Sequence, residues 1–198
     1  INDKVKFGIR YNLTTLENEV LSVSTDGDFI AGGSFGVGQD PPARMEAGFP
    51  IGYFRGFKTD GIFQTQDEID NYPVINDQVQ PGDLRFVDLN GDGVINDDDK
   101  TQIGKPLPDV TMGLNLSANV GNFDFIAYGF ASFGNDIVRN YERNQPLTNR
   151  TTYYLDRWTG AGSTDAFPRV TSGANSNNLF SDFFVEDGSF FRLNNINM

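Results

Sequence analysis

Apolar and polar side chains alternate strictly along several stretches of the chain, and this period of two predicts β-strands with one apolar and one polar face. In the first stretch the apolar positions are Val5, Phe7, Ile9, Tyr11 and Leu13. In the second they are Met112, Leu114, Leu116, Ala118 and Val120. Lys, Arg, Asn, Ser and Gly fill the positions between them.

A third alternating stretch, residues 123–133, follows the second after a short turn at Gly121-Asn122. Ile126, Tyr128 and Phe130 fall on one of its faces. Its other face carries Phe125, Ala127, Gly129 and Ala131. Two alternating runs joined by a tight glycine-containing turn predict a long β-hairpin.

Loop lengths separate two all-β folds that share this alternation. An antiparallel sandwich with one solvated face gives the same pattern as the wall of a membrane barrel. Here the turn at residues 121–122 is short, whereas residues 134–182 form a long connection rich in Asn, Thr and Gly. Outer-membrane barrels combine short periplasmic turns with long extracellular loops. We therefore predict an all-β chain of antiparallel strands that belong to a large transmembrane β-barrel.

Two short helices are expected within the long connections. Thr65 and Glu68 have the spacing of a helix-capping box, and Pro73 marks the end of that segment. Residues 153–158 form the second candidate, which ends before Gly160.

Composition excludes several kinds of chemistry. The chain has 198 residues and a net charge of −12, which argues against a nucleic-acid partner because phosphates require a basic surface. It contains no cysteine and no histidine, so disulfides, Cys/His zinc sites and Ser-His-Asp catalysis are excluded for this chain. An acidic balance suits cation binding instead.

The two ends of the sequence suggest a piece of a longer protein. No apolar run approaches the roughly 18 residues of a transmembrane helix, and no charged-then-apolar signal segment begins the chain. Residues 1–3 lead directly into a strand, and residues 193–198 stop within a strand-like run. We therefore expect partner segments of the same protein nearby.

The segment DLNGDGVINDDD, residues 88–99, has the donor spacing of a twelve-residue calcium loop. In such loops positions 1, 3, 5, 9 and 12 supply side-chain oxygens, position 6 is glycine, and position 7 supplies its carbonyl. The predicted calcium ligands are Asp88, Asn90, Asp92, Val94, Asn96 and Asp99. A pair of turn dipeptides at residues 90–93 is the alternative, but it leaves Asp88, Asn96 and Asp99 unexplained.

Two features distinguish this loop from an EF-hand. Position 12 is Asp99 rather than the usual Glu, so its carboxylate has a shorter reach. Residues 84–87, before the loop, are strand-like rather than helical. We therefore predict a structural calcium loop on a β scaffold, and not a sensor that opens a pair of helices.

Four segments carry a resemblance to a known family. They are GFPIGYFRGFKTDGIFQTQDEI at 48–69, PGDLRFVDLNGDGVINDDDKTQIGKPLPD at 81–109, YYLDRWTG at 153–160 and FFVEDGSFFRLNNI at 183–196. In order and spacing they resemble the C-terminal part of the SusC/RagA-like TonB-dependent outer-membrane receptors. The resemblance covers most of the chain from residue 48 onward.

The resemblance implies that residues 1–198 are a late-strand portion of one outer-membrane β-barrel in a Gram-negative bacterium, without the N-terminal plug domain. Such receptors import oligosaccharides or peptides together with a SusD-like surface lipoprotein. The segment that contacts TonB and the remaining barrel strands would lie outside this chain. The calcium loop would then stiffen an extracellular loop.

Other functions remain open on the sequence alone. A secreted calcium-stabilised β-domain for adhesion or carbohydrate binding would share the loop at 88–99. Trp158, Tyr153 and Tyr154 could stack on a sugar or pack a small loop core. An enzyme would depend on paired carboxylates, for which Asp182, Glu186 and Asp187 are nominal candidates. No sequence context singles them out, so we predict no enzymatic activity.

Overall fold

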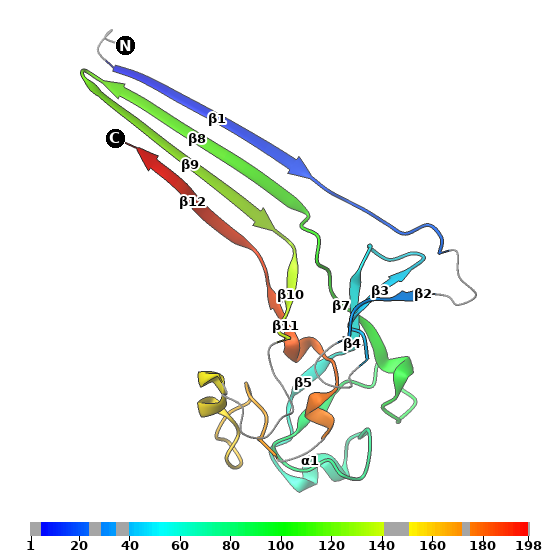
Figure 1. Cartoon of the computed structure of the whole chain (residues 1–198). Coiled ribbons are helices and arrows are strands. Elements are labelled where there is room, and N and C mark those ends of the chain that lie inside the picture. Colours follow the sequence, from blue (N-terminus) through cyan, green and yellow to red (C-terminus); the bar gives the residue numbers. More distant parts are fainter. Residues whose placement is uncertain (1–4, 24–28, 35–39, 141–150, 172–174, 198) are drawn as a thin grey trace.

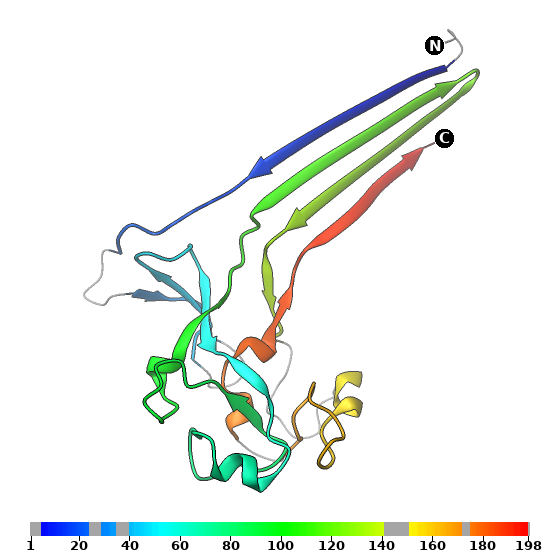
Figure 2. The ribbon, with the colours of Figure 1, turned by 180° about the vertical axis from the view of Figure 1, so that it is seen from behind.

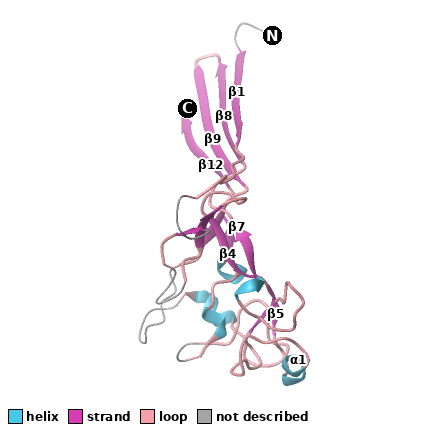
Figure 3. Cartoon of the chain, turned by 90° about the vertical axis from the view of Figure 1, so that its right-hand side faces the viewer, coloured by secondary structure: helices cyan, strands magenta, loops and turns pink. Residues whose placement is uncertain are grey.

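The computed structural model describes residues 5–23, 29–34, 40–140, 151–171 and 175–197. A long antiparallel sheet extends away from an assembly of short strands, short helices and loops (Figure 1). We call this second part, formed by the described residues within 16–109 and 134–189, the loop assembly. The side view shows the helices within the loop assembly and away from the long sheet (Figure 3).

Four strands form the long sheet in the order β1-β8-β9-β12. Their bounds are Val5–Thr15 for β1, Val110–Val120 for β8, Phe123–Phe133 for β9 and Phe190–Asn197 for β12. All neighbours are antiparallel, and β8 and β9 are joined by the short turn at residues 121–122. The predicted hairpin is confirmed.

The pairing register keeps one face of this sheet apolar across β1 and β8. Ile9 lies opposite Leu116, and Phe7 lies opposite Ala118. Between these two strands the opposite face pairs polar groups, as where Arg10 lies beside Asn115, whereas β9 adds Ile126, Tyr128 and Phe130 to that face. Since successive side chains of a strand point to opposite faces, a shift of one residue would mix the two sets. The register therefore preserves the alternation seen in the sequence.

A β-bulge in β12 preserves the same apolar face. Leu193 lies opposite Gly129, but the register shifts before Asn195. Ile196 consequently lies opposite Ala127, which is on the same face as Gly129. Leu193 and Ile196 are three residues apart and would point to opposite faces in a regular strand. The extra residue of the bulge brings both to the apolar face.

The apolar face is largely uncovered by the described part of the chain. Phe7 is 75% exposed, Ile9 70% and Tyr11 81%. Contiguous apolar surface of this kind marks a site of contact with protein or membrane. The sheet therefore requires a surrounding that the described residues do not supply.

The connection between β1 and β8 contains two further sheets. Strands β2 (Phe29–Ala31), β3 (Ala43–Glu46), β4 (Tyr53–Phe57) and β7 (Lys100–Gly104) pair in that order. Strand β5 (Thr59–Ile62) pairs with β6 (Leu84–Phe86), and the helix α1 (Gln66–Asp70) follows β5. Thr65 caps α1 by accepting a hydrogen bond from the Glu68 amide, as predicted.

The described residues of the connection between β9 and β12 are mostly irregular. Strand β10 (Asp136–Val138) pairs with β11 (Val185–Asp187). Three 3-10 helices accompany them: η2 (Thr152–Asp156), η3 (Ser176–Asn178) and η4 (Asp182–Phe184). The second helix predicted from the sequence is therefore the 3-10 helix η2, which ends before Trp158.

The two connections share one apolar core. Phe57, Ile62, Leu84, Phe86 and Ile95 form its main cluster, and all are buried. Trp158, Leu179 and Phe183 of the other connection pack against this cluster. A second cluster joins Phe54 to Phe180 and Phe184. Burial of these side chains from both connections holds the loop assembly together.

Among the described residues, no helix is both long enough and apolar enough to cross a membrane.

Candidate functional site

The Asp-rich segment 88–99 runs from the end of β6 to the 3-10 helix η1 (Asp97–Asp99). It lies at the edge of the loop assembly, among the green segments of Figure 2. Gly91 and Gly93 adopt φ values of 73° and 83°, a region that residues with a Cβ rarely occupy. The two glycines allow the chain to turn tightly around the side chains at the start of the loop.

The first half of the loop wraps around Asp88. Its Oδ1 accepts the Gly91 amide at 2.7 Å, and its Oδ2 accepts the Gly93 amide at 2.8 Å. Asp92 Oδ1 accepts the Val94 amide, and Asp92 Oδ2 accepts a hydrogen bond from the Asn90 side chain. A carboxylate has about four acceptor positions, so these contacts leave lone pairs on both carboxylates.

Asp99 closes the loop from its other end. It is fully buried, and its two oxygens accept the amides of Leu89, Asn90 and Asn96. Burial by itself would raise the pKa of the Asp99 carboxyl, but the three amide hydrogen bonds together outweigh it and lower the pKa below its ordinary value. The carboxyl at position 12 is thus held in its charged form against the start of the loop.

Asp97, which is not a predicted ligand, ties the loop to the neighbouring sheet. Its carboxylate lies 3.1 Å from Arg55 Nη1 on β4 and 2.7 Å from Lys100 Nζ on β7. The hydrogen bond from Lys100 is the main cause that lowers the pKa of Asp97, and Arg55 adds to it. Both strands therefore hold the end of the loop in place.

The donor set of the loop fits a hard cation. It combines carboxylate, amide and carbonyl oxygens within a single short turn, the chemistry that calcium prefers. Asn96 is also the cap of η1, since its Oδ1 accepts the Asp98 amide. No group of three or more His, Cys, Asp or Glu side chains within the described ranges is placed to hold a metal ion. The structure therefore does not bring the carboxylates of Asp88, Asp92 and Asp99 together as a set of ligands, and calcium binding stays a prediction.

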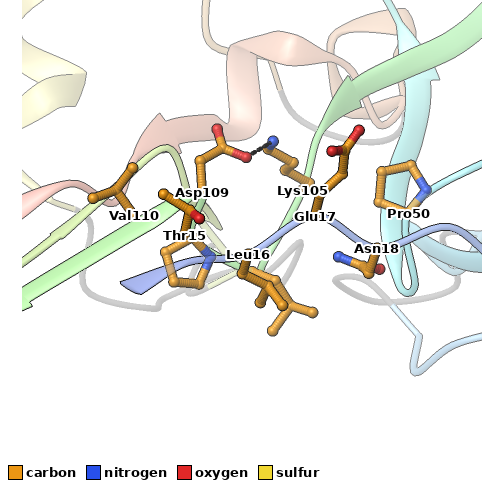
Figure 4. Close-up of a pocket in the computed structure, with 10 residues that line it drawn as sticks. Thr15, Leu16, Glu17, Asn18, Pro50, Lys105, Asp109 and Val110 are labelled. Atoms are coloured by element: carbon orange, nitrogen blue, oxygen red, sulfur yellow. Dashed lines mark hydrogen bonds and ion pairs between the residues drawn. The ribbon is translucent and has the colours of Figure 1, made fainter. Parts of the chain in front are cut away.

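A hollow of about 480 Å³ lies where β1 ends and β8 begins (Figure 4). Lys105 and Asp109 on its wall form an ion pair with each other. Asn18 accepts the backbone amide of Ile51 at 2.8 Å. Lys105, Asp109 and Asn18 are thus engaged within the protein, and the hollow marks the seam between the long sheet and the loop assembly.

The aromatic residues of the second connection differ in their exposure. Trp158 packs against the main core cluster, and its Nε1 donates to Gln64 Oε1 at 3.0 Å. Tyr154 contacts the buried Phe167 ring, whereas Tyr153 is 50% exposed. Of the alternatives considered from the sequence, packing of a loop core therefore describes Trp158 and Tyr154.

The carboxylates considered for catalysis are each engaged separately. Asp182 accepts hydrogen bonds from the Thr59 amide and hydroxyl, and Glu186 pairs with Arg139. Asp187 accepts the Ser189 amide. These contacts are typical of residues that fix loops and strand ends.

A buried polar network was not apparent from the sequence. Asp83 is fully buried, and Arg169 binds both of its oxygens, through Nε at 2.6 Å and Nη2 at 3.0 Å. Asn177 donates to the same carboxylate at 2.9 Å and accepts the Leu84 amide at 2.8 Å. More than 80 residues separate Asp83 from its two side-chain partners, so no local spacing could have revealed the network.

The chain is similar to known receptors. It is 31% identical over 159 residues to TonB-dependent receptor P26 of Formosa agariphila, a match that covers 78% of this chain and 16% of that receptor. It is 26% identical over 192 residues to TonB-dependent receptor SusC of Bacteroides thetaiotaomicron, which covers 96% of this chain and 18% of SusC. The chain thus spans less than a fifth of the length of these two relatives.

Solved structures show the same fold. The RagAB peptide transporter matches with a TM-score of 0.70 and 19% identity, over 98% of this chain and 20% of that chain. The RagAB peptide importer in the open-open state matches with a TM-score of 0.68 and 20% identity, over 99% of this chain and 20% of that chain. No model of a protein family matches the sequence.

The fold and the relatives together define a class of protein: the chain belongs to the family of TonB-dependent receptors and matches a segment of them. Within that class it matches the SusC/RagA-like receptors, so the resemblance predicted from the four sequence motifs is confirmed. The antiparallel fold class is confirmed as well. The named relatives are receptors rather than enzymes.

Proposed function

We propose that the full-length protein is an outer-membrane receptor that imports oligosaccharides or peptides with energy from TonB. The observation that carries this proposal is the four-stranded sheet with one continuous apolar face, joined at one end to a large folded loop assembly. The similarity to TonB-dependent receptors supports it. No catalytic step forms part of the proposed function.

The arrangement of strands and loops suggests an orientation in a Gram-negative outer membrane. The short turn at residues 121–122 would face the periplasm, and the loop assembly would face the exterior. In this orientation the apolar face contacts lipid and the polar face lines the barrel interior. The remaining strands of the receptor would pair with the free edges of β1 and β12.

We also propose a SusD-like surface lipoprotein as the partner above the loop assembly. The similarity to SusC and to the RagAB structures supports this partner. TonB would be engaged through segments of the receptor outside this chain. Oligosaccharides and peptides both remain substrates within this proposal.

Deletion of the gene for the full-length receptor in the source bacterium tests the import function. We expect loss of growth on the imported oligosaccharide or peptide, and deletion of TonB should produce the same defect. A plasmid copy of the receptor should restore growth. Undiminished growth without the receptor on all such nutrients, or recovery of the receptor in buffer without detergent, would contradict the proposal.

We propose further that residues 88–99 bind a structural calcium ion. Asp88, Asn90, Asp92, Asn96 and Asp99 would supply side-chain oxygens, and Val94 its carbonyl. A bound divalent ion would offset the repulsion among the carboxylates of this loop and so stiffen it. The oxygen donor present at every ligand position of the twelve-residue pattern supports this assignment.

Calorimetric titration of the chelator-treated receptor with calcium tests the assignment. We expect Asp88→Ala to weaken binding by about tenfold or more, because each factor of ten corresponds to only about 1.4 kcal/mol. Asp98→Asn is the matched control, since Asp98 is exposed in the same loop and is not a predicted ligand. The absence of binding heat at millimolar calcium, or equal binding by Asp88→Ala, would refute a calcium site here.

A further inference from the structure

An open polar pocket of about 430 Å³ lies where the two connections of the loop assembly meet. The first connection contributes Gln64, Glu68 and Arg85 to its wall, and the second contributes Gly162, Thr164 and Asp165. The pocket is thus formed only when the connections pack together. It is separate from the Asp-rich segment 88–99.

Gln64 fixes the two walls of this pocket relative to each other. Its Oε1 accepts hydrogen bonds from Trp158 Nε1 at 3.0 Å and from the Gly162 amide at 2.8 Å. Its Nε2 donates to the Ile62 and Thr164 carbonyls at 3.2 and 3.1 Å. All of its hydrogen-bonding capacity is therefore used within the protein. The pocket wall is preorganised rather than formed by mobile surface groups.

Two carboxylates on the wall are held by one oxygen each. Glu68 Oε2 accepts the Gln64 amide at 2.7 Å, and Asp165 Oδ1 accepts the Ile62 amide at 2.8 Å. Within the described ranges, Glu68 Oε1 and Asp165 Oδ2 have no hydrogen-bond partner. The orientation of both groups is thus set, and each offers a free acceptor.

Arg85 adds hydrogen-bond donors to the same wall. Its Nη2 donates to Asp60 at 3.1 Å, and its guanidinium lies 5.5 Å from the centre of the Tyr72 ring. Its Nε is buried and has no acceptor in the part of the chain that the structure describes, and other atoms of Arg85 line the pocket. The pocket therefore presents fixed acceptors and a fixed cationic donor group together.

We propose that this pocket binds the hydroxyl groups of a neutral oligosaccharide. An anion would face the two carboxylates of Glu68 and Asp165, and a metal cation would face the guanidinium of Arg85. A hydroxyl group both donates and accepts, so it matches this mixed wall. Uptake of the bound carbohydrate rests on the proposed import function. Carbohydrate would then be the substrate class of that function.

Binding of the detergent-purified full-length receptor to an array of neutral oligosaccharides and of peptides tests this proposal. The informative variant is Glu68→Gln with Asp165→Asn, because each amide oxygen can still accept the backbone amide that the carboxylate held. The carboxylate oxygen that was free to accept is then replaced by an amide NH2 group, which donates. We expect oligosaccharide binding to weaken by about tenfold or more.

Asp67→Asn with Asp70→Asn is the matched control, since it removes the same charge from exposed positions on α1. This control should bind oligosaccharides like the unmodified receptor. Three results would overturn the proposal: no oligosaccharide binds, the pocket variant binds them normally, or the pocket variant loses only the binding of peptides. A different result would contradict the import function instead: oligosaccharide binding depends on the pocket, but the receptor does not support growth on that oligosaccharide. Failure of the pocket proposal and failure of the import proposal are therefore distinguishable.

Discussion

Asp83→Asn should increase hydrogen exchange of the Leu84 and Arg169 amides by about a hundredfold in the full-length receptor. Asp83 is fully buried, and Arg169 binds both of its oxygens. Loss of one charge from a buried pair typically costs about 3–5 kcal/mol, because the other charge loses its partner. These amides exchange when the structure around them opens locally. A loss of about 3 kcal/mol of local stability therefore increases their exchange about a hundredfold.

Asp60→Asn is the matched control for this prediction. Asp60 also pairs with an arginine, Arg85, at 3.1 Å, but its side chain is 62% exposed. Exposed ion pairs contribute only about 0–1 kcal/mol. Exchange of the Leu84 and Arg169 amides should therefore change by less than about fivefold in this control. Equal effects of the two substitutions would show that the buried pair does not hold the connections together.

The buried pair matters because it joins the two connections that build the loop assembly. In addition to the side-chain contacts of Arg169, its backbone amide donates to the Gly82 carbonyl at 2.7 Å. Asn177, further along the second connection, donates to Asp83 and accepts the Leu84 amide. The two long connections, of which the second is mostly irregular in its described part, are thereby held in one arrangement. The polar pocket between the same connections depends on that arrangement.

The long sheet could be predicted from the sequence because its information is local. Alternation along β1, β8 and β9 needs only neighbouring residues, and the turn at residues 121–122 fixes the hairpin. The bulge in β12 was not predictable in the same way. Leu193 and Ile196 break the alternation, and only the pairing with Gly129 and Ala127 shows how both reach the apolar face.

The loop assembly was predicted less completely for a physical reason. The donor spacing of the segment 88–99 and the cap at Thr65 are local patterns, so the sequence reveals them. The roles of Gln64 and Asp83 depend on partners about 90 residues away, brought close by packing of the two connections. A single sequence contains no local signal for such contacts. The part played by Trp158 in the core was for this reason left open.

Leu116→Lys should reduce the amount of folded receptor in the outer membrane severalfold. Leu116 lies near the middle of β8 on the apolar face, opposite Ile9, and is 40% exposed. A lysine on the lipid-facing side of a membrane barrel costs about 2–4 kcal/mol near the midplane of the bilayer. Ser117→Lys is the matched control, because the next residue of the strand points to the opposite, polar face.

The central claim is that the apolar face of the long sheet contacts lipid while its polar face lines an aqueous interior. The most direct test is the heat-dependent gel mobility of the two full-length variants, which separates folded from unfolded barrel in isolated outer membranes. We expect little folded receptor for Leu116→Lys and a nearly normal amount for Ser117→Lys. Equal folding of both variants, or a greater loss for Ser117→Lys, would contradict it.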